Sequence, residues 1–295
     1  MDNYVLSCCS TADLSKKHLV KRDIKYIFFH YELNGKEYLD DLGESMSITD
    51  FYEAMKEGAR TKTSQINETE FEEFFEPFLL EGKDILHVCL SSGISGVINS
   101  AHIAKRILEA KYPERKIYLV DSLAASSGYG LIMDRLADMR DEGRGIEELY
   151  EWIEENKRKM QHWFFTTDLT YLVRGGRVSK AAGLVGGILN ICPLLTVDHL
   201  GQLVPHQKVR TKKKVIEAMV EQMVVHAQKG VGYSDKCYIS HSSCYGDACL
   251  VADEIERRFP QLNGRVLINN IGTTIGSHTG PGTVALFFWG DNREN

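Results

Sequence analysis

Residues 85–97 read Ile-Leu-His-Val-Cys-Leu-Ser-Ser-Gly-Ile-Ser-Gly-Val. The apolar run at 85–90 predicts a strand, and the hydroxyl residues and glycines after it predict a turn. A helix is expected directly afterwards, over residues 97–110, because apolar side chains recur there at helical spacing. A strand that passes through a tight turn into a helix is typical of the repeating units of a parallel sheet.

The same alternation extends in both directions along the chain. Before residue 160, strands are expected at 4–7, 24–31 and 117–121, and helices at 49–57, 67–80 and 146–159. After it, strands are expected at 163–167, 194–197, 203–207, 237–240, 265–268 and 283–289, with helices at 211–229 and 247–259 and a hairpin turn at 198–201. We therefore predict a two-domain α/β protein. A mostly parallel sheet forms the N-terminal domain, residues 1–160, and a smaller α/β domain follows, residues 161–295.

The composition excludes several classes of protein. A chain of 295 residues buries a core without disulfides or metals, and 43% hydrophobic with 26% charged residues excludes intrinsic disorder. The net charge of −6 argues against a nucleic-acid backbone as the main partner. The N-terminus lacks the pattern of a secretory signal. The longest uncharged stretch, residues 181–197, is shorter than the roughly 20 apolar residues of a spanning helix. We expect a cytoplasmic protein without a membrane span.

The cysteines and histidines point to neither redox nor metal chemistry. The chain has seven cysteines, an odd number, with no Cys-x-x-Cys pair, and we expect most of them to be buried thiols. The ten histidines show no metal-ligand spacing. No metal and no cofactor is therefore predicted.

The turn at Ser91-Ser-Gly-Ile-Ser95-Gly96 is the first candidate site. Ligands of open α/β sheets bind at the carboxyl ends of the strands, where the free N–H groups of a helix N-terminus attract anions. The alternative is that Ser95 only caps the following helix. The segment also approaches the nucleophile elbow Gly-x-Ser-x-Gly, but Val97 stands where the second glycine is required.

Two further segments carry polar side chains in a pattern that suits an anion. Residues 60–65, Arg-Thr-Lys-Thr-Ser-Gln, are expected to form a loop that binds an anion or caps the next helix. Arg174-Gly-Gly-Arg177 is either a solvated turn or a pair of guanidinium groups aimed at an anion or a partner. The uncharged stretch 181–197 that follows is predicted to be buried core or to face an apolar ligand.

The last candidate is Gly276-Ser-His278-Thr279-Gly-Pro-Gly282, expected to be a tight turn that leads into the final strand. His278 in such a turn serves as an acid or base, as a hydrogen-bonding partner, or only as a turn residue. The residues alone leave these alternatives open.

Taken together and in this order, these segments resemble the DegV family of bacterial fatty-acid-binding proteins. The matching pieces are Ser10-Thr-Ala-Asp13-Leu14, Thr63-Ser-Gln65, Ser91 to Gly96, Asp121-Ser122, Arg174-Gly-Gly-Arg177 and His278 to Gly282. The chain departs from the usual family pattern at Cys9, Ile66, Asn67 and Val97, where aspartate, proline, serine and threonine are common.

The resemblance implies a non-catalytic protein that holds one long-chain fatty acid and presents it to a separate ATP-using fatty-acid kinase subunit. Carried over by motif, Thr63 and Ser95 bind the carboxylate, with Ser64, Gly96, His278 and Thr279 close by. Arg174 belongs to the same polar network or to the docking face for the kinase. Elementary chemistry agrees, because a carboxylate away from water needs several hydrogen-bond donors and an acyl tail needs an apolar cavity.

Two other functions compete with this hypothesis. An acyl hydrolase with Ser95 as nucleophile and His278 as base requires a hydrogen bond between the two and a third group that orients the imidazole. An interaction protein with a structural lipid would differ from the carrier only in lacking a kinase partner.

Overall fold

The computed structural model describes residues 3–179 and 191–293. A four-stranded sheet in the N-terminal half has the order β2-β1-β6-β7 and is parallel throughout. Its strands are β1 (Tyr4–Cys9), β2 (Ile24–Ile27), β6 (Asp84–Cys89) and β7 (Ile117–Asp121). The α/β class and the parallel sheet predicted around residues 85–97 are confirmed.

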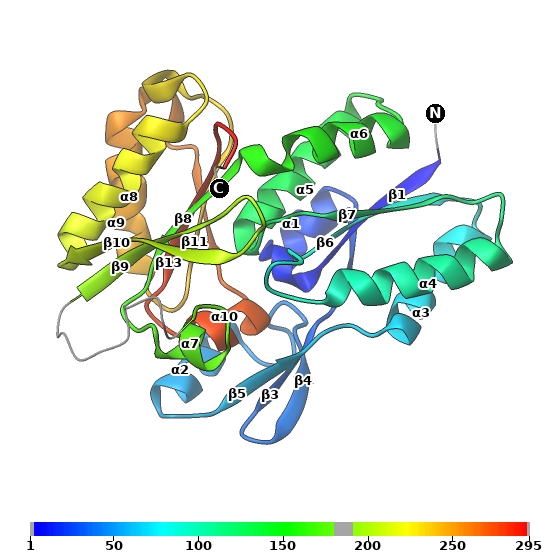
Figure 1. The fold of residues 1–295 in the computed structure, drawn as a ribbon, viewed down its shortest axis with the longest axis horizontal. Coiled ribbons are helices and arrows are strands. Elements are labelled where there is room, and N and C mark those ends of the chain that lie inside the picture. Colours follow the sequence, from blue (N-terminus) through cyan, green and yellow to red (C-terminus); the bar gives the residue numbers. More distant parts are fainter. Residues whose placement is uncertain (1–2, 180–190, 294–295) are drawn as a thin grey trace.

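Helices cover both faces of this sheet (Figure 1). On one side lie α3 (Glu68–Leu80) and α4 (Val97–Lys111), and on the other lie α5 (Ser126–Asp141) and α6 (Ile146–Asn156). The short α1 (Lys16–Lys21) precedes β2. Asn67, one of the departures from the family pattern, starts α3 with a capping box that it shares with Glu70. Gly128 and Gly130 in α5 have no room for a side chain, because a Cβ would lie 2.5 Å from His162 Nε2 at the first position and 2.5 Å from the carbonyl oxygen of Ala12 at the second.

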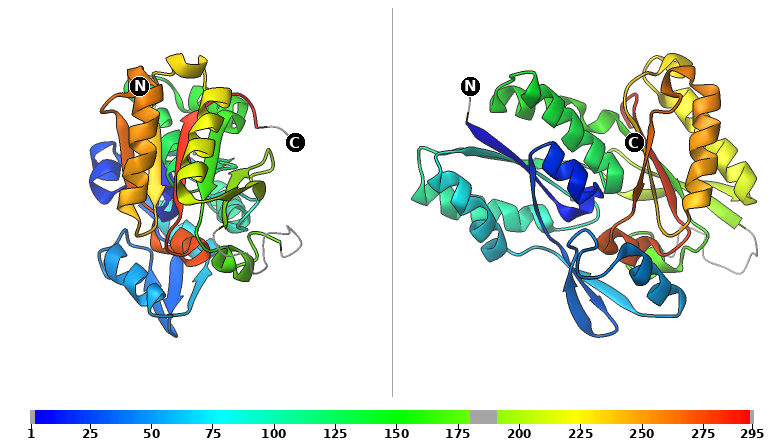
Figure 2. Two further views of the ribbon diagram at one scale, coloured as in Figure 1. Left: turned by 90° about the vertical axis from the view of Figure 1, so that its left-hand side faces the viewer. Right: turned by 180° about the vertical axis from the view of Figure 1, so that it is seen from behind.

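A six-stranded mixed sheet forms the C-terminal half, in the order β10-β9-β8-β13-β11-β12. Only β11 and β12 run parallel to each other. Helices α8 (Lys212–His226) and α9 (Tyr245–Arg258) pack against this sheet (Figure 2). The strands are β8 (Met160–Phe165), β9 (Ile191–Val197), β10 (Leu203–Arg210), β11 (Cys237–His241), β12 (Val266–Asn270) and β13 (Val284–Trp289). The hairpin turn expected at 198–201 joins β9 to β10. The domain division at residue 160 stays a prediction, although β8 begins there.

A third, antiparallel sheet was not expected from the sequence. It has the order β4-β3-β5, with β3 (His30–Leu33), β4 (Lys36–Leu39) and β5 (Thr61–Ser64), and it packs with α2 (Ile48–Lys56) around a small core of its own. Two predictions are wrong here. The expected strand 24–31 is divided between two sheets, and residues 61–64, predicted as loop, pair with β3.

The segment around His278 also differs from its prediction. Residues expected to form a turn lie in α10 (Thr273–Thr279), and the tight turn begins only at Gly280, where φ is +70°. This helix packs against α7 (Thr170–Arg174), α2, β3 and β5. It therefore connects the small sheet to the C-terminal half. Short 3₁₀ helices lie at Ser10–Ala12, Lys157–Lys159, Gly230–Gly232 and Pro260–Leu262.

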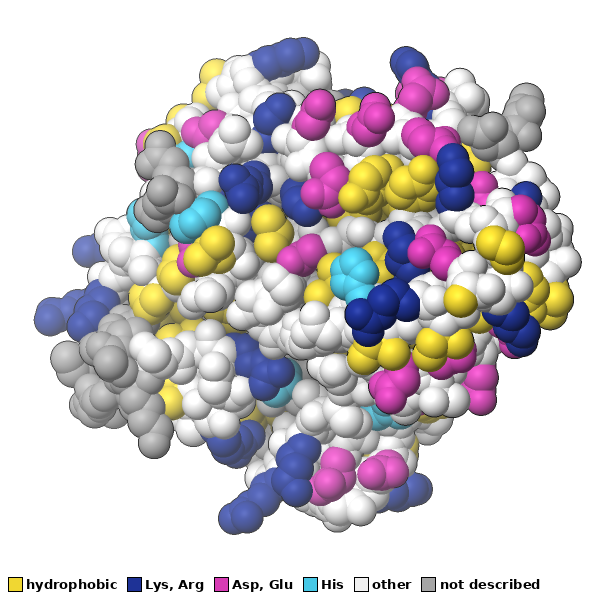
Figure 3. Space-filling view, turned by 45° about the vertical axis from the view of Figure 1, so that its right-hand side comes forward, with side chains coloured by type: hydrophobic (Ala, Val, Ile, Leu, Met, Phe, Trp, Pro, Cys, Tyr) yellow, Lys and Arg dark blue, Asp and Glu magenta, His cyan; other side chains and the backbone are white. Residues whose placement is uncertain are grey.

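The surface is mixed in charge, as the composition indicates. On the face in Figure 3, acidic and basic side chains are interspersed, with hydrophobic side chains between them, some single and some in small groups. Five of the cysteines are buried and two are partly buried, and all seven are free thiols. No helix within the described residues is long and apolar enough to cross a bilayer.

Candidate functional site

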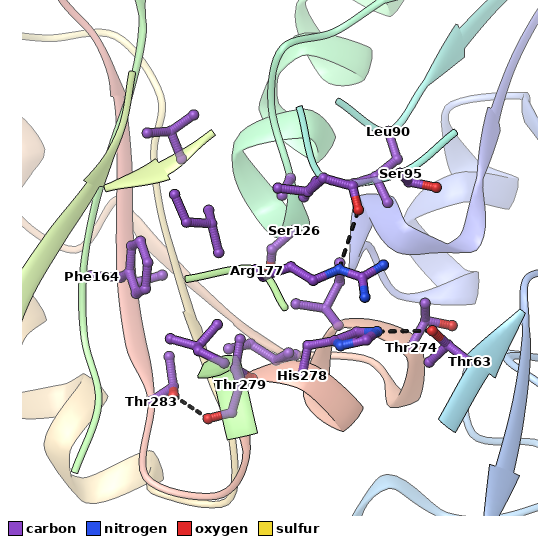
Figure 4. Close-up of a pocket in the computed structure, with 18 of the residues that line it drawn as sticks. Thr63, Leu90, Ser95, Ser126, Phe164, Arg177, Thr274, His278, Thr279 and Thr283 are labelled. Atoms are coloured by element: carbon purple, nitrogen blue, oxygen red, sulfur yellow. Dashed lines mark hydrogen bonds between the residues drawn. The ribbon is translucent and has the colours of Figure 1, made fainter. Parts of the chain in front are cut away.

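A cavity of about 400 Å³ lies between the six-stranded sheet and the connections of the other two sheets. One side, here called the sheet wall, consists of Phe164, Val197, Leu203, Ala285 and Phe287. The opposite side, here called the polar wall, consists of Thr63, Ser64, Ser95, Gly96, Arg177 and His278. Figure 4 shows the two sides facing each other, with Phe164 across the cavity from Ser95 and Thr63.

The loop that carries Ser95 is held in place by the β9–β10 hairpin. The Ser91 hydroxyl donates to the carbonyl of Gly201 at 2.8 Å. Gly93 is required at its position, because a Cβ there would lie 2.6 Å from the backbone of Gly201. Contacts with a distant strand pair therefore fix the turn between β6 and α4.

Helix α4 begins at the cavity. Its cap residue, Gly96, has no side chain to satisfy the first N–H groups, and the Ser95 hydroxyl accepts a hydrogen bond from the Val97 N–H at 3.3 Å. A helix of fifteen residues has a positive N-terminal end that attracts an anion. The sequence left Ser95 as either a cap or a binding residue. The structure places it at the cavity with a weak capping bond.

Thr63 and His278 form a hydrogen-bonded pair in the polar wall. Their Oγ1 and Nε2 atoms are 2.8 Å apart. Burial, and then the positive charges of Arg177 and Arg174, lower the pKa of His278 to about 4, so the imidazole is neutral at pH 7. Gly175 makes room for the ring, because a Cβ there would lie 2.3 Å from His278 Nδ1.

Arg177 supplies the positive charge of the polar wall. Its guanidinium group donates to the carbonyls of Ile94, at 3.2 Å, and Gly175, at 2.6 Å. Burial lowers its pKa, and no acidic group in the described part of the chain offsets this. Figure 4 shows the guanidinium group between Ser95 and His278. The donors not used by the two carbonyls are available to an anion in the cavity.

The structure brings together most of the residues that the family resemblance implied. Thr279 lines the cavity together with Thr63, Ser64, Ser95, Gly96 and His278. Arg174 does not line it and lies over the ring of Tyr171, with 4.9 Å between its Cζ atom and the ring centre. Arg177, the second arginine of the same motif, lines the cavity instead of Arg174. The sequence pattern gives no signal that separates the two arginines, because both flank the same pair of glycines.

The uncharged stretch 181–197 can be compared with the cavity only in part, because residues 180–190 lie outside the described residues. Val197 belongs to the sheet wall, and Leu194 and Leu195 are fully buried. The expected role of residues 181–190 in lining the cavity stays a prediction.

The described geometry does not favour the hydrolase alternative. His278 is bonded to Thr63, and no hydrogen bond joins it to Ser95 within the described residues. The second ring nitrogen, Nδ1, has no hydrogen-bond partner there, so the group that would orient a catalytic imidazole is missing from the same residues. The described residues also contain no cluster of three or more ligands that could hold a metal ion.

An apolar cavity whose polar wall combines hydroxyl groups, a helix N-terminus and a partly buried arginine defines a class of protein. It is typical of proteins that bind an amphiphilic small molecule with an anionic head group. The fold and the cavity can now be compared with those of known proteins.

A family model described as "Uncharacterised protein, DegV family" matches residues 9–291. A DegV domain-containing protein of Clostridium perfringens is 37% identical over 297 aligned residues that cover 100% of both chains. A fatty acid-binding protein of Thermotoga maritima is 30% identical over 281 residues, 94% of each chain. The structure of a DegV family protein from Thermus thermophilus, described as binding fatty acid, has a TM-score of 0.86 and 26% identity, and the match covers 98% of this chain and 100% of that one. The chain belongs to the DegV family.

Proposed function

We propose that this protein binds one long-chain fatty acid in the cavity and has no catalytic activity of its own. The observation that carries the proposal is an apolar cavity whose polar wall contains Arg177, a partly buried cation without an acidic partner in the described parts of the chain. An ionised carboxylate neutralises that charge and accepts the free donors around it. The relatives described as fatty-acid-binding proteins support this choice of ligand.

In this proposal the carboxylate is held by the hydroxyl groups of Thr63 and Ser95, with Arg177 as its counter-ion. If His278 carries its proton on Nε2, it donates to Thr63 and leaves the Thr63 hydroxyl proton for the carboxylate. Ser64, Gly96 and Thr279 complete the surroundings of the head group. Hydrogen bonds to a charged group contribute about 1.5–3 kcal/mol each, enough to fix the head group at this wall.

The acyl chain then lies along the sheet wall. Phe164, Leu203 and Phe287 present apolar surface there, and each CH₂ group removed from water contributes about 0.8 kcal/mol. The tail therefore supplies most of the affinity, and the polar wall fixes the orientation.

We propose further that the protein presents the fatty acid to a separate ATP-using fatty-acid kinase subunit in the cytoplasm. The family resemblance motivates this role. Hydroxyl donors with a single arginine leave the carboxylate less neutralised than a set of several cations would, so its oxygens remain able to attack a phosphoryl group. The free thiols suit a reducing compartment. The protein then needs no cofactor, and Arg174, outside the cavity, is available for docking.

The head-group assignment is tested by replacing Thr63→Ala and Ser95→Ala together. We expect palmitate affinity to fall about tenfold or more, because the carboxylate loses two donors, while the thermal midpoint stays close to that of the unmodified protein. Thr69→Ala, an exposed threonine in α3, is the matched control and should bind normally. Unchanged palmitate affinity in the double variant, measured by calorimetry, would contradict the assignment.

The carrier role is tested separately with a purified ATP-using fatty-acid kinase subunit. Acyl phosphate, trapped with hydroxylamine, should form only when kinase, ATP and the loaded protein are all present. Acyl-phosphate formation that does not depend on this protein would exclude the carrier role.

A further inference from the structure

The segment Ser10-Thr-Ala-Asp13-Leu14 matches the family pattern but takes no part in the polar wall described above. It lies at the end of β1 and is almost fully buried. Its polar side chains join those of distant segments in one cluster. We call this cluster the aspartate hub, and it consists of Ser10, Asp13, Asp40, Ser126 and Thr273.

Asp13 anchors the starts of two helices. Its Oδ1 accepts the N–H of Gly272 at 2.9 Å, directly before α10, and its Oδ2 accepts the hydroxyl of Ser126, the first residue of α5. Asp13 and Ser126 have φ angles of +49° and +53°, which residues other than glycine rarely adopt. Such strained backbone persists where the surrounding contacts impose it, and it clusters at functional sites.

Asp40 connects the same point to the small antiparallel sheet. The Ser10 hydroxyl donates to its Oδ2 at 3.2 Å, and the Thr273 hydroxyl donates to its Oδ1 at 2.8 Å. Asp40 directly follows β4, and its backbone N–H bonds to the carbonyl of Phe29 at 2.8 Å. The two carboxyl groups therefore join four elements at one place: the four-stranded sheet, the small sheet, α5 and α10.

The aspartate hub adjoins the proposed ligand cavity. Ser126 and Thr274 line that cavity, and α10 carries His278 on its last turn. His278 in turn holds Thr63 on the small sheet. A shift at the start of α10 would therefore move the pair that the proposed function assigns to the carboxylate.

We propose that Asp13 and Asp40 are positioning residues for fatty-acid binding: they fix the start of α10 and thereby hold His278 and Thr63 in the arrangement that binds the carboxylate. This inference rests on the proposed function of the cavity. Neither aspartate is assigned to touch the ligand, and both act through α10.

Because the aspartate hub contains two carboxyl groups, how firmly it holds the start of α10 should depend on pH. Burial raises the pKa of both carboxyl groups, and Asp40 raises that of Asp13 further. The titratable groups that face them are Tyr31 from β3 and Tyr52 from α2. Lys16 lines a surface groove that Asp13 and Asp40 also line, but its ammonium group is paired with Glu44. No described cation neutralises the pair. As the pH rises and both carboxyl groups ionise, their repulsion should loosen the start of α10.

The test uses the full chain, freed of lipid, with two variants of one residue. Asp13→Ala removes both helix anchors, and we expect palmitate affinity about tenfold weaker at pH 7. Asp13→Asn keeps the shape and can still bond to Gly272 and Ser126, so it should bind like the unmodified protein at pH 7. It should also lose the fall in affinity that we expect of the unmodified protein as the pH becomes alkaline. Asp253→Ala, at an exposed position in α9, is the matched control.

A second measurement does not depend on the ligand. Amide hydrogen exchange over residues 271–281 in the ligand-free protein should be faster in Asp13→Ala than in Asp253→Ala and unchanged in Asp13→Asn. Equal affinity and equal exchange in all variants would overturn the positioning role, and so would an alkaline loss of affinity that persists in Asp13→Asn. If the unmodified protein binds neither palmitate nor oleate, the proposed function fails, and the exchange rates alone then decide whether the hub positions α10.

Discussion

The two walls of the cavity are built in different ways. The sheet wall comes from strands of one sheet, with Phe164 on β8, Leu203 on β10 and Phe287 on β13. The polar wall gathers side chains from four separate segments, at Thr63, Ser95, Arg177 and His278. The sheet wall is thus an extension of an ordinary hydrophobic core, whereas the polar wall exists only when three sheets and α10 are correctly placed. Affinity for the tail should tolerate small changes in packing, but recognition of the head group should not.

The largest effect is expected from a charge placed on the sheet wall. Leu203→Asp would bury a carboxylate against the acyl chain, and we expect palmitate affinity to fall about a hundredfold or more. Leu200→Asp, in the adjacent turn where the side chain is exposed, is the control and should bind normally. Calorimetric titration with palmitate measures the affinity of both variants. Equal affinities would show that the tail does not lie along the sheet wall.

A smaller effect should separate the two arginines of the Arg174-Gly-Gly-Arg177 motif. Arg177→Gln removes the counter-ion but keeps a hydrogen-bond donor, so palmitate affinity should fall about tenfold. Arg174→Gln should keep its affinity for palmitate, because the Arg174 side chain lies over Tyr171 outside the cavity. The reverse order of affinities would mean that Arg174, not Arg177, neutralises the carboxylate.

The smallest effect concerns the stability of the polar wall in acid. Burial holds the pKa of His278 at about 4, below the 6.5 of an unfolded histidine, so the unfolded chain takes up this proton more readily. The free energy of unfolding should therefore fall as the pH drops, and this residue contributes about 1 kcal/mol of the loss between pH 7 and pH 5.5. His278→Gln should show a correspondingly smaller loss in urea unfolding. The same loss in both proteins would contradict a buried, neutral imidazole.

The sequence predicted those parts of the molecule whose structure is set locally. The strand, turn and helix over residues 85–97 have a strong apolar pattern, and they appear in the structure as β6 and α4. The turn at 198–201 was predicted for the same reason, since the polar and glycine residues there lie between two apolar runs.

The missed elements depend on distant partners. Strand β5, Thr-Lys-Thr-Ser, has no apolar face and is a strand only because β3 pairs with it. Helix α10 is short and contains Gly276, and Asp13, far away in the sequence, binds the N–H of Gly272 at its start. The choice between Arg174 and Arg177 depended on the direction of a glycine turn in which Gly176 has a φ of +72°. The family resemblance therefore indicated most residues of the polar wall, but not how the wall is assembled.

The central claim is that this cavity holds a fatty acid. The most direct measurement is mass spectrometry of an organic extract of the purified protein, together with the native mass of the intact protein. We expect one long-chain fatty acid at close to one molecule per chain, and a native mass that exceeds the sequence mass by that amount. A lipid-free protein that also fails to bind added palmitate or oleate would contradict the account.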